Sequence, residues 1–299
     1  MKKLNILLGD PHHKTMGQHS TMMPLALGLI ATATQKLLPH ADISIRIETD
    51  VTVLCEAIER GGIDVLGLSS YCWNARLSQL LFRKMKERAP ETVCIAGGPE
   101  FDLATPESCQ KYLRGNPDLD FYVVREGELT SAAIIAGLAK GTPVADIKEQ
   151  CLPGAMSLDP AGNLFPFSHR ERIKELDSIP SPYLSGIMDC FFDRGFMPFI
   201  QSSRGCPYTC AYCAAGDSWY GKVYHFSLER TKAELAYIAP RMQHSPQTPL
   251  AISDSNFGIF ENDLELAKYF KELRETYNWP QVFDVSTGKS HMDRIMEMA

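Results

Sequence analysis

The chain has 299 residues, 44% of them hydrophobic and 22% charged, and a formal net charge of −6. This composition excludes an intrinsically disordered chain, because it supplies enough apolar surface for two folded domains. The acidic balance also excludes a protein that is attracted to nucleic acid or anionic lipid by its overall charge.

The amino terminus and the cysteines predict a soluble, cytoplasmic protein. Residues 1–10 contain two lysines and a short apolar stretch, but they reach an acid at position 10 and have no cleavage-site pattern, so we expect a first strand there. No apolar run approaches the roughly 18 to 20 residues that a membrane span needs. Nine cysteines at irregular spacing favour a reducing compartment over a disulfide framework.

Residues 1–140 alternate short apolar runs with longer amphipathic stretches. This β–α–β pattern is typical of a parallel sheet covered by helices, and it predicts a Rossmann-like domain. The predicted strands are residues 3–8, 42–47, 65–69, 93–96 and 121–124. The predicted helices lie between and after them, at residues 24–38, 52–60, 74–88, 106–114 and 130–138.

Residues 141–194 have a different texture. Pro153, Gly154 and the turn-forming residues 160–163 interrupt short apolar segments and predict a small hairpin. Residues 176–183 contain two prolines and predict an extended linker. We therefore expect the boundary between two domains in this region.

Residues 195–299 return to a β/α pattern. Strands are predicted at 197–201, 250–253 and 282–285, and helices at 228–238, 262–276 and 290–298. A closed (β/α) barrel needs more than three strands. We therefore expect an α/β protein whose Rossmann-like domain is followed by a partial (β/α) barrel, truncated at residue 299, with an open half-barrel as the alternative.

Three cysteines on one loop form the most informative motif. Cys206, Cys210 and Cys213 have C-x-x-x-C-x-x-C spacing and follow a predicted strand, whose carboxyl end is where β/α folds bind ligands. Thiolates select zinc or iron–sulfur clusters, and structural zinc sites and electron-transfer clusters normally have a fourth protein ligand. Three thiolates therefore predict a metal with one position open for a substrate or cofactor; a zinc site or incidental cysteines are the alternative.

The cysteine loop resembles the cluster loop of the radical S-adenosylmethionine superfamily. The resemblance implies that Cys206, Cys210 and Cys213 bind three irons of a 4Fe-4S cluster, while the fourth iron binds the amino and carboxylate groups of S-adenosyl-L-methionine (SAM). Reduction of the cluster by an external donor such as flavodoxin or ferredoxin would then cleave SAM to a 5′-deoxyadenosyl radical.

Flanking motifs resemble the subgroup in which a cobalamin-binding domain precedes the radical barrel. They are LGLSS at 66–70, AGGPE at 96–100, VVREGE at 123–128 and LDSIP at 176–180. The resemblance spans nearly the whole chain. It implies a cobalamin-binding Rossmann-like domain at 1–140, a hairpin and linker at 141–194, and the N-terminal half of a radical SAM barrel at 195–299.

Within these motifs, five residues are candidates near cobalamin. Gly97 and Gly98 would let the backbone approach the nucleotide tail of cobalamin, and Ser69 or Ser70 would hydrogen-bond that tail. The alternative is a tight turn with a helix cap. Glu126, in the third motif, is a family marker whose contact is not specified.

His12 is a candidate axial ligand of cobalt. Residues 10–17, DPHHKTMG, are similar to the D-x-H-x-x-G box of other cobalamin proteins, but the glycine comes too late and members of the radical subgroup commonly lack the box. The alternative is that His12 and His13 lie in a loop near the cofactor without binding the metal.

Asp254 and Asn256 end the second predicted strand of residues 195–299. The superfamily places residues that hold the amino group of SAM there, and both side chains offer acceptors for an ammonium. An Asx turn that caps the next segment is the alternative.

The resemblance therefore implies a cobalamin-dependent radical SAM enzyme and favours a methyltransferase that acts on an unactivated carbon or phosphorus centre. Methylcobalamin would donate the methyl group, and a second SAM would restore it. The alternatives are a rearrangement or cyclisation enzyme, a tRNA methylthiotransferase, and a non-catalytic cobalamin- or zinc-binding module. The substrate, a small molecule or peptide, is not identified, and no nucleic acid or membrane is expected as a partner.

Overall fold

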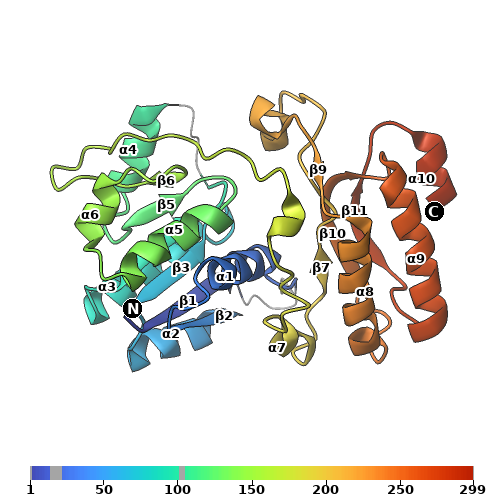
Figure 1. Ribbon diagram of the computed structural model, residues 1–299, viewed down its shortest axis with the longest axis horizontal. Helices are drawn as coiled ribbons and strands as arrows, with labels where there is room; N and C mark the ends of the chain where they lie inside the picture. The colour runs from blue at the N-terminus through green and yellow to red at the C-terminus, as the bar shows by residue number, and fades with distance from the viewer. Residues whose placement is uncertain (1, 14–21, 101–104, 299) are drawn as a thin grey trace. The chain divides into compact units, whose positions relative to one another are not determined.

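The computed structural model describes residues 2–13, 22–100 and 105–298 (Figure 1). Contacts between residues divide the chain into two compact units. The first ends at Arg172, and the second begins at Ile173 and also includes residues 22–25. None of the helices in the described ranges combines the length and the apolar character that crossing a membrane requires.

The first unit is built on a six-stranded sheet in the order β2-β1-β3-β4-β5-β6 (Figure 1). Strands β1 to β5 are parallel, and β6 is antiparallel to β5 at the edge. The strands are β1 (Leu4–His12), β2 (Ile43–Asp50), β3 (Val65–Ser69), β4 (Val93–Gly97), β5 (Phe121–Val123) and β6 (Ala155–Met156). The strand order reverses between β1 and β3, and open α/β sheets bind ligands at the carboxyl ends of the strands at such a point.

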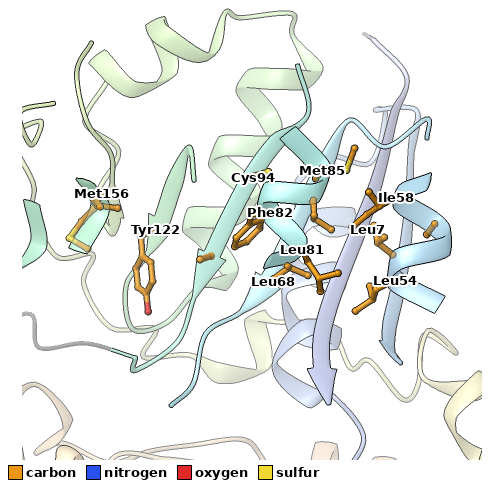
Figure 2. Close-up of a cluster of buried hydrophobic side chains, with 14 of the residues drawn as sticks. Leu7, Leu54, Ile58, Leu68, Leu81, Phe82, Met85, Cys94, Tyr122 and Met156 are labelled. Atoms are coloured by element: carbon orange, nitrogen blue, oxygen red, sulfur yellow. The ribbon is translucent and has the colours of Figure 1, made fainter. Parts of the chain in front are cut away.

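Helices cover both faces of this sheet. They are α1 (Leu25–Leu37), α2 (Val51–Arg60), α3 (Ala75–Arg88), α4 (Pro106–Arg114), α5 (Glu128–Ala139) and α6 (Val144–Glu149). Figure 2 shows Leu54 and Ile58 of α2, with Leu81 and Phe82 of α3, against one face of the sheet. Because successive strand residues point to opposite faces, the other face is apolar as well, and α1 and α5 cover it (Figure 1).

All five strands and five helices predicted for residues 1–140 are present, with ends that differ by a few residues. The short helix α6 was not predicted, because six residues are too few to show a helical period. The predicted hairpin is also present: Leu158 pairs with Leu164, and the Asn163 backbone N–H donates to Asp159 Oδ1 over 2.7 Å.

The prediction of an extended linker at residues 176–183 was wrong. This segment begins with a short 3-10 helix, η1 (Leu176–Ser178), and its apolar residues Leu176, Ile179 and Tyr183 are buried in the second unit. The Tyr183 hydroxyl also donates to the Phe199 carbonyl over 2.8 Å. The prolines do extend the chain locally, but the free energy gained by burying three large side chains keeps the segment packed in the second unit.

The second unit contains a parallel three-stranded sheet in the order β11-β10-β7 (Figure 1). Its elements are α7 (Asp189–Phe192), β7 (Phe199–Ile200), β8 (Ser203–Arg204), η2 (Ala214–Gly216), η3 (Ser218–Tyr220), β9 (Tyr224–His225), α8 (Leu228–Met242), β10 (Leu250–Phe257), α9 (Glu261–Tyr277), β11 (Phe283–Thr287) and α10 (Met292–Met298). Helices α8 and α9 connect successive parallel strands, as the β/α pattern predicted. Strands β8 and β9 form a small antiparallel ribbon that the sequence did not indicate.

A buried ion pair attaches the 176–183 segment to α8. Glu234 Oε1 accepts hydrogen bonds from Arg230 Nε over 2.9 Å and from Ser181 Oγ over 2.6 Å, and Arg230 Nη1 donates to the Ile179 carbonyl over 2.9 Å. Burial raises the pKa of Glu234, and the positive charge of Arg230 opposes that rise. Arg230 therefore compensates the negative charge of the buried Glu234 in this core.

We expect Arg230→Met to lower the free energy of unfolding by about 3 kcal/mol, because it leaves the Glu234 carboxylate buried without its cation. Arg274→Met on the exposed face of α9 is the matched control and should change stability by less than about 0.5 kcal/mol. Urea denaturation measures both. Equal losses in the two variants would contradict this account.

Candidate functional site

The cysteine loop starts where β7 ends, and its two ends are held together by the β8–β9 ribbon. Ser203 pairs with His225, and Arg204 with Tyr224. The Cys206 backbone N–H donates to the Tyr220 carbonyl over 2.9 Å, which closes the loop one residue further in. The ribbon thus holds the two ends of residues 205–222 together, so that these residues form a closed loop.

Two glycines in this loop have no room for a side chain. Gly205 has φ 120°, and a Cβ there would lie 2.4 Å from the Lys222 carbonyl oxygen. A Cβ on Gly216 would lie 2.3 Å from the Cys210 carbonyl oxygen. Both contacts are with backbone atoms, which cannot move aside, so the loop needs glycine at both positions.

A buried carboxylate ties the start of the loop to β10. Asp254 is 2% exposed, and its Oδ1 accepts a hydrogen bond from the Ser202 backbone N–H over 2.8 Å. Its Oδ2 accepts from the hydroxyls of Ser202 over 2.5 Å and Ser203 over 2.7 Å. The register of the sheet explains the contact, because Ile252 lies beside Ile200 and two further residues along each strand bring Asp254 beside Ser202.

Two of the three thiols contact donors from β10 and from the turn after β11. Asn256 Nδ2 lies 3.1 Å from Cys206 Sγ, which is buried, and Lys289 Nζ lies 2.9 Å from Cys210 Sγ. The hydrogen bond from Lys289, followed by one from Tyr212, lowers the pKa of Cys210. Cys213 is exposed. The contact with Lys289 therefore favours the thiolate of Cys210, the form of cysteine that binds metals.

Three thiols on one loop fit an iron–sulfur cluster, although their sulfur atoms are not grouped around one point. All nine cysteines lie in the described part of the chain, and none is in a disulfide. Among the described residues, no three Cys, His, Asp or Glu side chains are grouped closely enough to hold a metal ion. Cluster binding therefore requires the thiols of Cys206, Cys210 and Cys213 to turn toward a common centre.

Sequence reasoning missed Lys289 and Ser290, which follow β11. Ser290 Oγ lies 2.5 Å from the Tyr208 hydroxyl, inside the cysteine loop. Lys289 and Cys210 are 79 residues apart, so no local pattern connects them. The one available signal was their position just after the third strand of a β/α unit, at the edge where the cysteine loop also begins.

In the first unit, polar side chains meet at the carboxyl ends of β1 and β3. Ser69 Oγ donates to Asp10 Oδ1 over 2.5 Å, and Asn74 Nδ2 donates to both of these oxygens. His12 Nε2 lies 3.1 Å from Asp10 Oδ2. Gly9 pairs with Leu68, so the next residue of each strand brings Asp10 beside Ser69. This polar group lies at the reversal of the strand order, and sequence reasoning missed Asp10 and Asn74 as parts of it.

The turns after β3 and β4 pack closely against each other beside this polar group. The Ser70 backbone N–H donates to the Gly97 carbonyl over 2.7 Å. Gly98 has φ 139°, and a Cβ there would lie 2.3 Å from the Ser70 carbonyl oxygen. The Tyr122 hydroxyl donates to the Gly98 carbonyl over 2.5 Å. The two glycines therefore leave bare backbone at the sheet edge, and Gly98 has a conformation that other residues rarely adopt.

The remaining candidates of the first unit have other surroundings. The Glu126 carboxylate lies 3.5 Å from Arg172 Nε, with both side chains largely buried. Residues 14–17 of the predicted histidine box lie outside the described residues. His13 Nε2 lies 2.8 Å from the carbonyl of Trp73. Trp73 is 59% exposed, and its ring stacks on Tyr71 with 4.5 Å between centroids.

Comparisons with known proteins find similarity over most of the chain. It is 30% identical over 242 residues to 2-(S-pantetheinyl)-carbapenam-3-carboxylate methyltransferase from Streptantibioticus cattleyicolor, and equally identical to the cobalamin-dependent radical SAM methyltransferase TokK from Streptomyces tokunonensis. The chain is thus similar in sequence to cobalamin-dependent radical SAM methyltransferases, as its cysteine loop and flanking motifs predicted. Each alignment covers 79% of this chain but 34% of the relative, so the chain spans about a third of the length of these two curated relatives. No protein-family model matches.

Solved structures of superfamily members have a similar fold. The radical enzyme OxsB, with aqua-cobalamin and SAM bound, superimposes with a TM-score of 0.67 at 16% identity, covering 94% of this chain and 38% of OxsB. The methyltransferase TsrM from Kitasatospora setae, with cobalamin and a [4Fe-4S] cluster bound, gives a TM-score of 0.63 at 14% identity, covering 92% of this chain and 52% of TsrM. The α/β architecture with parallel sheets is thus similar to the folds of these two enzymes.

The pH dependence of stability should reveal the buried Asp254 carboxylate. Burial raises its pKa, and the hydrogen bonds from Ser202 and Ser203 oppose that rise. A raised folded-state pKa adds stability below the unfolded pKa, and that stability is lost as the pH rises through the folded pKa. Asp254→Asn cannot titrate and should lack this decline.

Urea denaturation between about pH 4 and pH 7 tests this expectation. The free energy of unfolding of the wild type minus that of Asp254→Asn should fall as the pH rises across this range. The exposed Asp284→Asn in β11 is the control and should follow the wild type. A constant difference between wild type and Asp254→Asn would contradict the assignment.

Proposed function

We propose that this chain is part of a cobalamin-dependent radical SAM methyltransferase. The observation that carries the proposal is the three-cysteine loop at the carboxyl end of β7, closed by β8–β9 and tied by Asp254 to β10. Sequence similarity to two enzymes named as methyltransferases favours methyl transfer over rearrangement or cyclisation. We further propose that residues 1–140 bind cobalamin, that 141–194 form the hairpin and connection, and that 195–299 form part of a radical SAM barrel.

In this proposal Cys206, Cys210 and Cys213 hold a 4Fe-4S cluster. When bound, the cluster supplies the electron that cleaves SAM, and cobalamin carries the methyl group to be transferred. Asn256 and Lys289 donate hydrogen bonds to two of the thiolates. Because Asp254 already accepts three hydrogen bonds from Ser202 and Ser203, which lead into the cysteine loop, its proposed role is to position that loop. Contact between Asn256 and the amino group of SAM remains a prediction.

For cobalamin, the proposed contact surface is the carboxyl edge of β1, β3 and β4. Gly97 and Gly98 present bare backbone there, and Ser69 and Ser70 lie beside them. We propose that His12 helps to hold Asp10, because its Nε2 is in contact with that carboxylate and not directed outward. The exposed Trp73 ring is a further surface against which a flat ligand could pack.

The substrate proposed is a small molecule, because the first relative is named for a carbapenam. The centre proposed to be methylated is an unactivated carbon or phosphorus. The electron would come from an external donor such as flavodoxin or ferredoxin. A tRNA methylthiotransferase is disfavoured, because it would need a second cysteine set in the first unit, where Cys94 and Cys109 are core residues.

Anaerobic reconstitution of the protein tests the cluster. We expect about four irons per chain and reductant-dependent release of 5′-deoxyadenosine from SAM, because three thiolates leave one iron open. Cys206→Ala, Cys210→Ala and Cys213→Ala should each lose most of the iron, whereas Cys190→Ala, an exposed cysteine outside the loop, should keep it. Zinc in place of iron in the wild type would support a non-catalytic module instead.

Gly98→Ala tests the cobalamin surface. The added methyl group must displace the Ser70 backbone, so we expect at least a tenfold loss of affinity for hydroxocobalamin in an absorbance titration. Gly141→Ala is a matched control, because Gly141 also has a positive φ, of 79°, but has open space around it. Circular dichroism confirms that both variants are folded. Equal affinities in folded variants would place cobalamin elsewhere.

A further inference from the structure

The turn after β11, residues 288–290, is fixed against the strand that carries Asp254 and Asn256. The Gly288 backbone N–H donates to the Phe257 carbonyl over 2.9 Å. A Cβ on Gly288 would lie 2.0 Å from Cγ2 of Ile259, so glycine allows this close approach. The position of Lys289 is therefore determined by the packing of β10 and β11, and not by the cysteine loop itself.

From this turn, two side chains reach into the cysteine loop. Lys289 Nζ lies 2.9 Å from Cys210 Sγ and over the rings of Tyr208 and Tyr212, at 5.6 and 5.7 Å from their centroids. Ser290 Oγ lies 2.5 Å from the Tyr208 hydroxyl. The ammonium is thus held between two aromatic rings and directed at one thiol, a geometry stabilised by cation–π attraction.

We propose that Lys289 is a positioning residue that donates a hydrogen bond to the Cys210 ligand of the cluster and raises the reduction potential of the cluster. This inference rests on the proposed function, because it needs a cluster on the three cysteines. Cluster reduction adds one electron, taken from an external low-potential donor, and so adds one negative charge. A fixed ammonium beside a ligand sulfur favours the more negative state.

The other donor to a thiol acts differently. Asn256 Nδ2 reaches Cys206 Sγ from β10 and is a neutral amide, so it offers a hydrogen bond without a net charge. Lys289 offers both. Of these two contacts, the one with Lys289 should therefore have the larger effect on the potential, since hydrogen bonds and net charge near the sulfurs both tune clusters.

The experiment compares Lys289→Met, Lys289→Arg and wild type after anaerobic reconstitution. Iron is counted first, and the reduced cluster is then followed by electron paramagnetic resonance during a titration with Ti(III) citrate. We expect Lys289→Met to keep its iron but to show a tenfold lower ratio of reduced to oxidised cluster at a fixed potential, which is about 59 mV for a one-electron couple. Lys289→Arg should stay close to wild type, because it keeps the charge and the donor.

Lys271→Met, at an exposed position on α9, controls for the general loss of a positive charge and should leave the potential unchanged. If the wild type binds no iron, the proposed function fails. If wild type and Lys289→Met bind equal iron at equal potential, this inference alone fails. Should Lys289→Met not retain iron, Lys289→Gln keeps a donor without the charge, and the same comparison of potentials decides.

Discussion

The hydrogen bonds of the buried Asp254 carboxylate hold the candidate site together. One side chain accepts from a backbone N–H and two hydroxyls at the point where β7 passes into the cysteine loop. A carboxylate buried at this depth is costly unless its oxygens are satisfied, so the three donors and the acceptor stabilise one another. The first cysteine follows only a few residues later, and the direction in which its loop leaves the sheet depends on this contact.

The register of parallel strands explains why both units gather polar side chains at one edge. In the second unit the pairing of β7 with β10 brings Ser202 beside Asp254. In the first unit the pairing of β1 with β3 brings Asp10 beside Ser69, and the pairing of β3 with β4 brings Ser69 beside Gly97. Parallel strands all end at the same edge, so residues distant in sequence meet there whenever the hydrophobic pattern fixes the register.

Glycine has a specific function at this edge in each unit. Gly98 and Gly205 adopt positive φ, and a Cβ atom on either residue would lie within about 2.5 Å of a carbonyl oxygen of another backbone segment. In the first unit this leaves bare backbone between the turns after β3 and β4. In the second it closes the loop that carries the cysteines. The same conformational freedom of glycine thus shapes two surfaces that differ in chemistry, one with bare backbone beside polar side chains and one with three thiols.

The sequence by itself determined the order of the elements, because that order depends on local patterns. Apolar periodicity predicted the strands and helices of residues 1–140, and the spacing of Cys206, Cys210 and Cys213 predicts a three-thiolate site. Local pattern failed at residues 176–183, where prolines suggested an extended linker but burial of Leu176, Ile179 and Tyr183 attaches the segment to the second unit.

Only the tertiary structure decided which side chains surround the site. Lys289 contacts Cys210 across 79 residues, and Asp254 contacts the loop instead of pointing to open space. Asp10 and Asn74 likewise join Ser69 through strand pairing and a turn. These contacts follow from register and from the packing of β10 against β7 and β11. Such long-range geometry is set by the whole core, which no short stretch of sequence encodes.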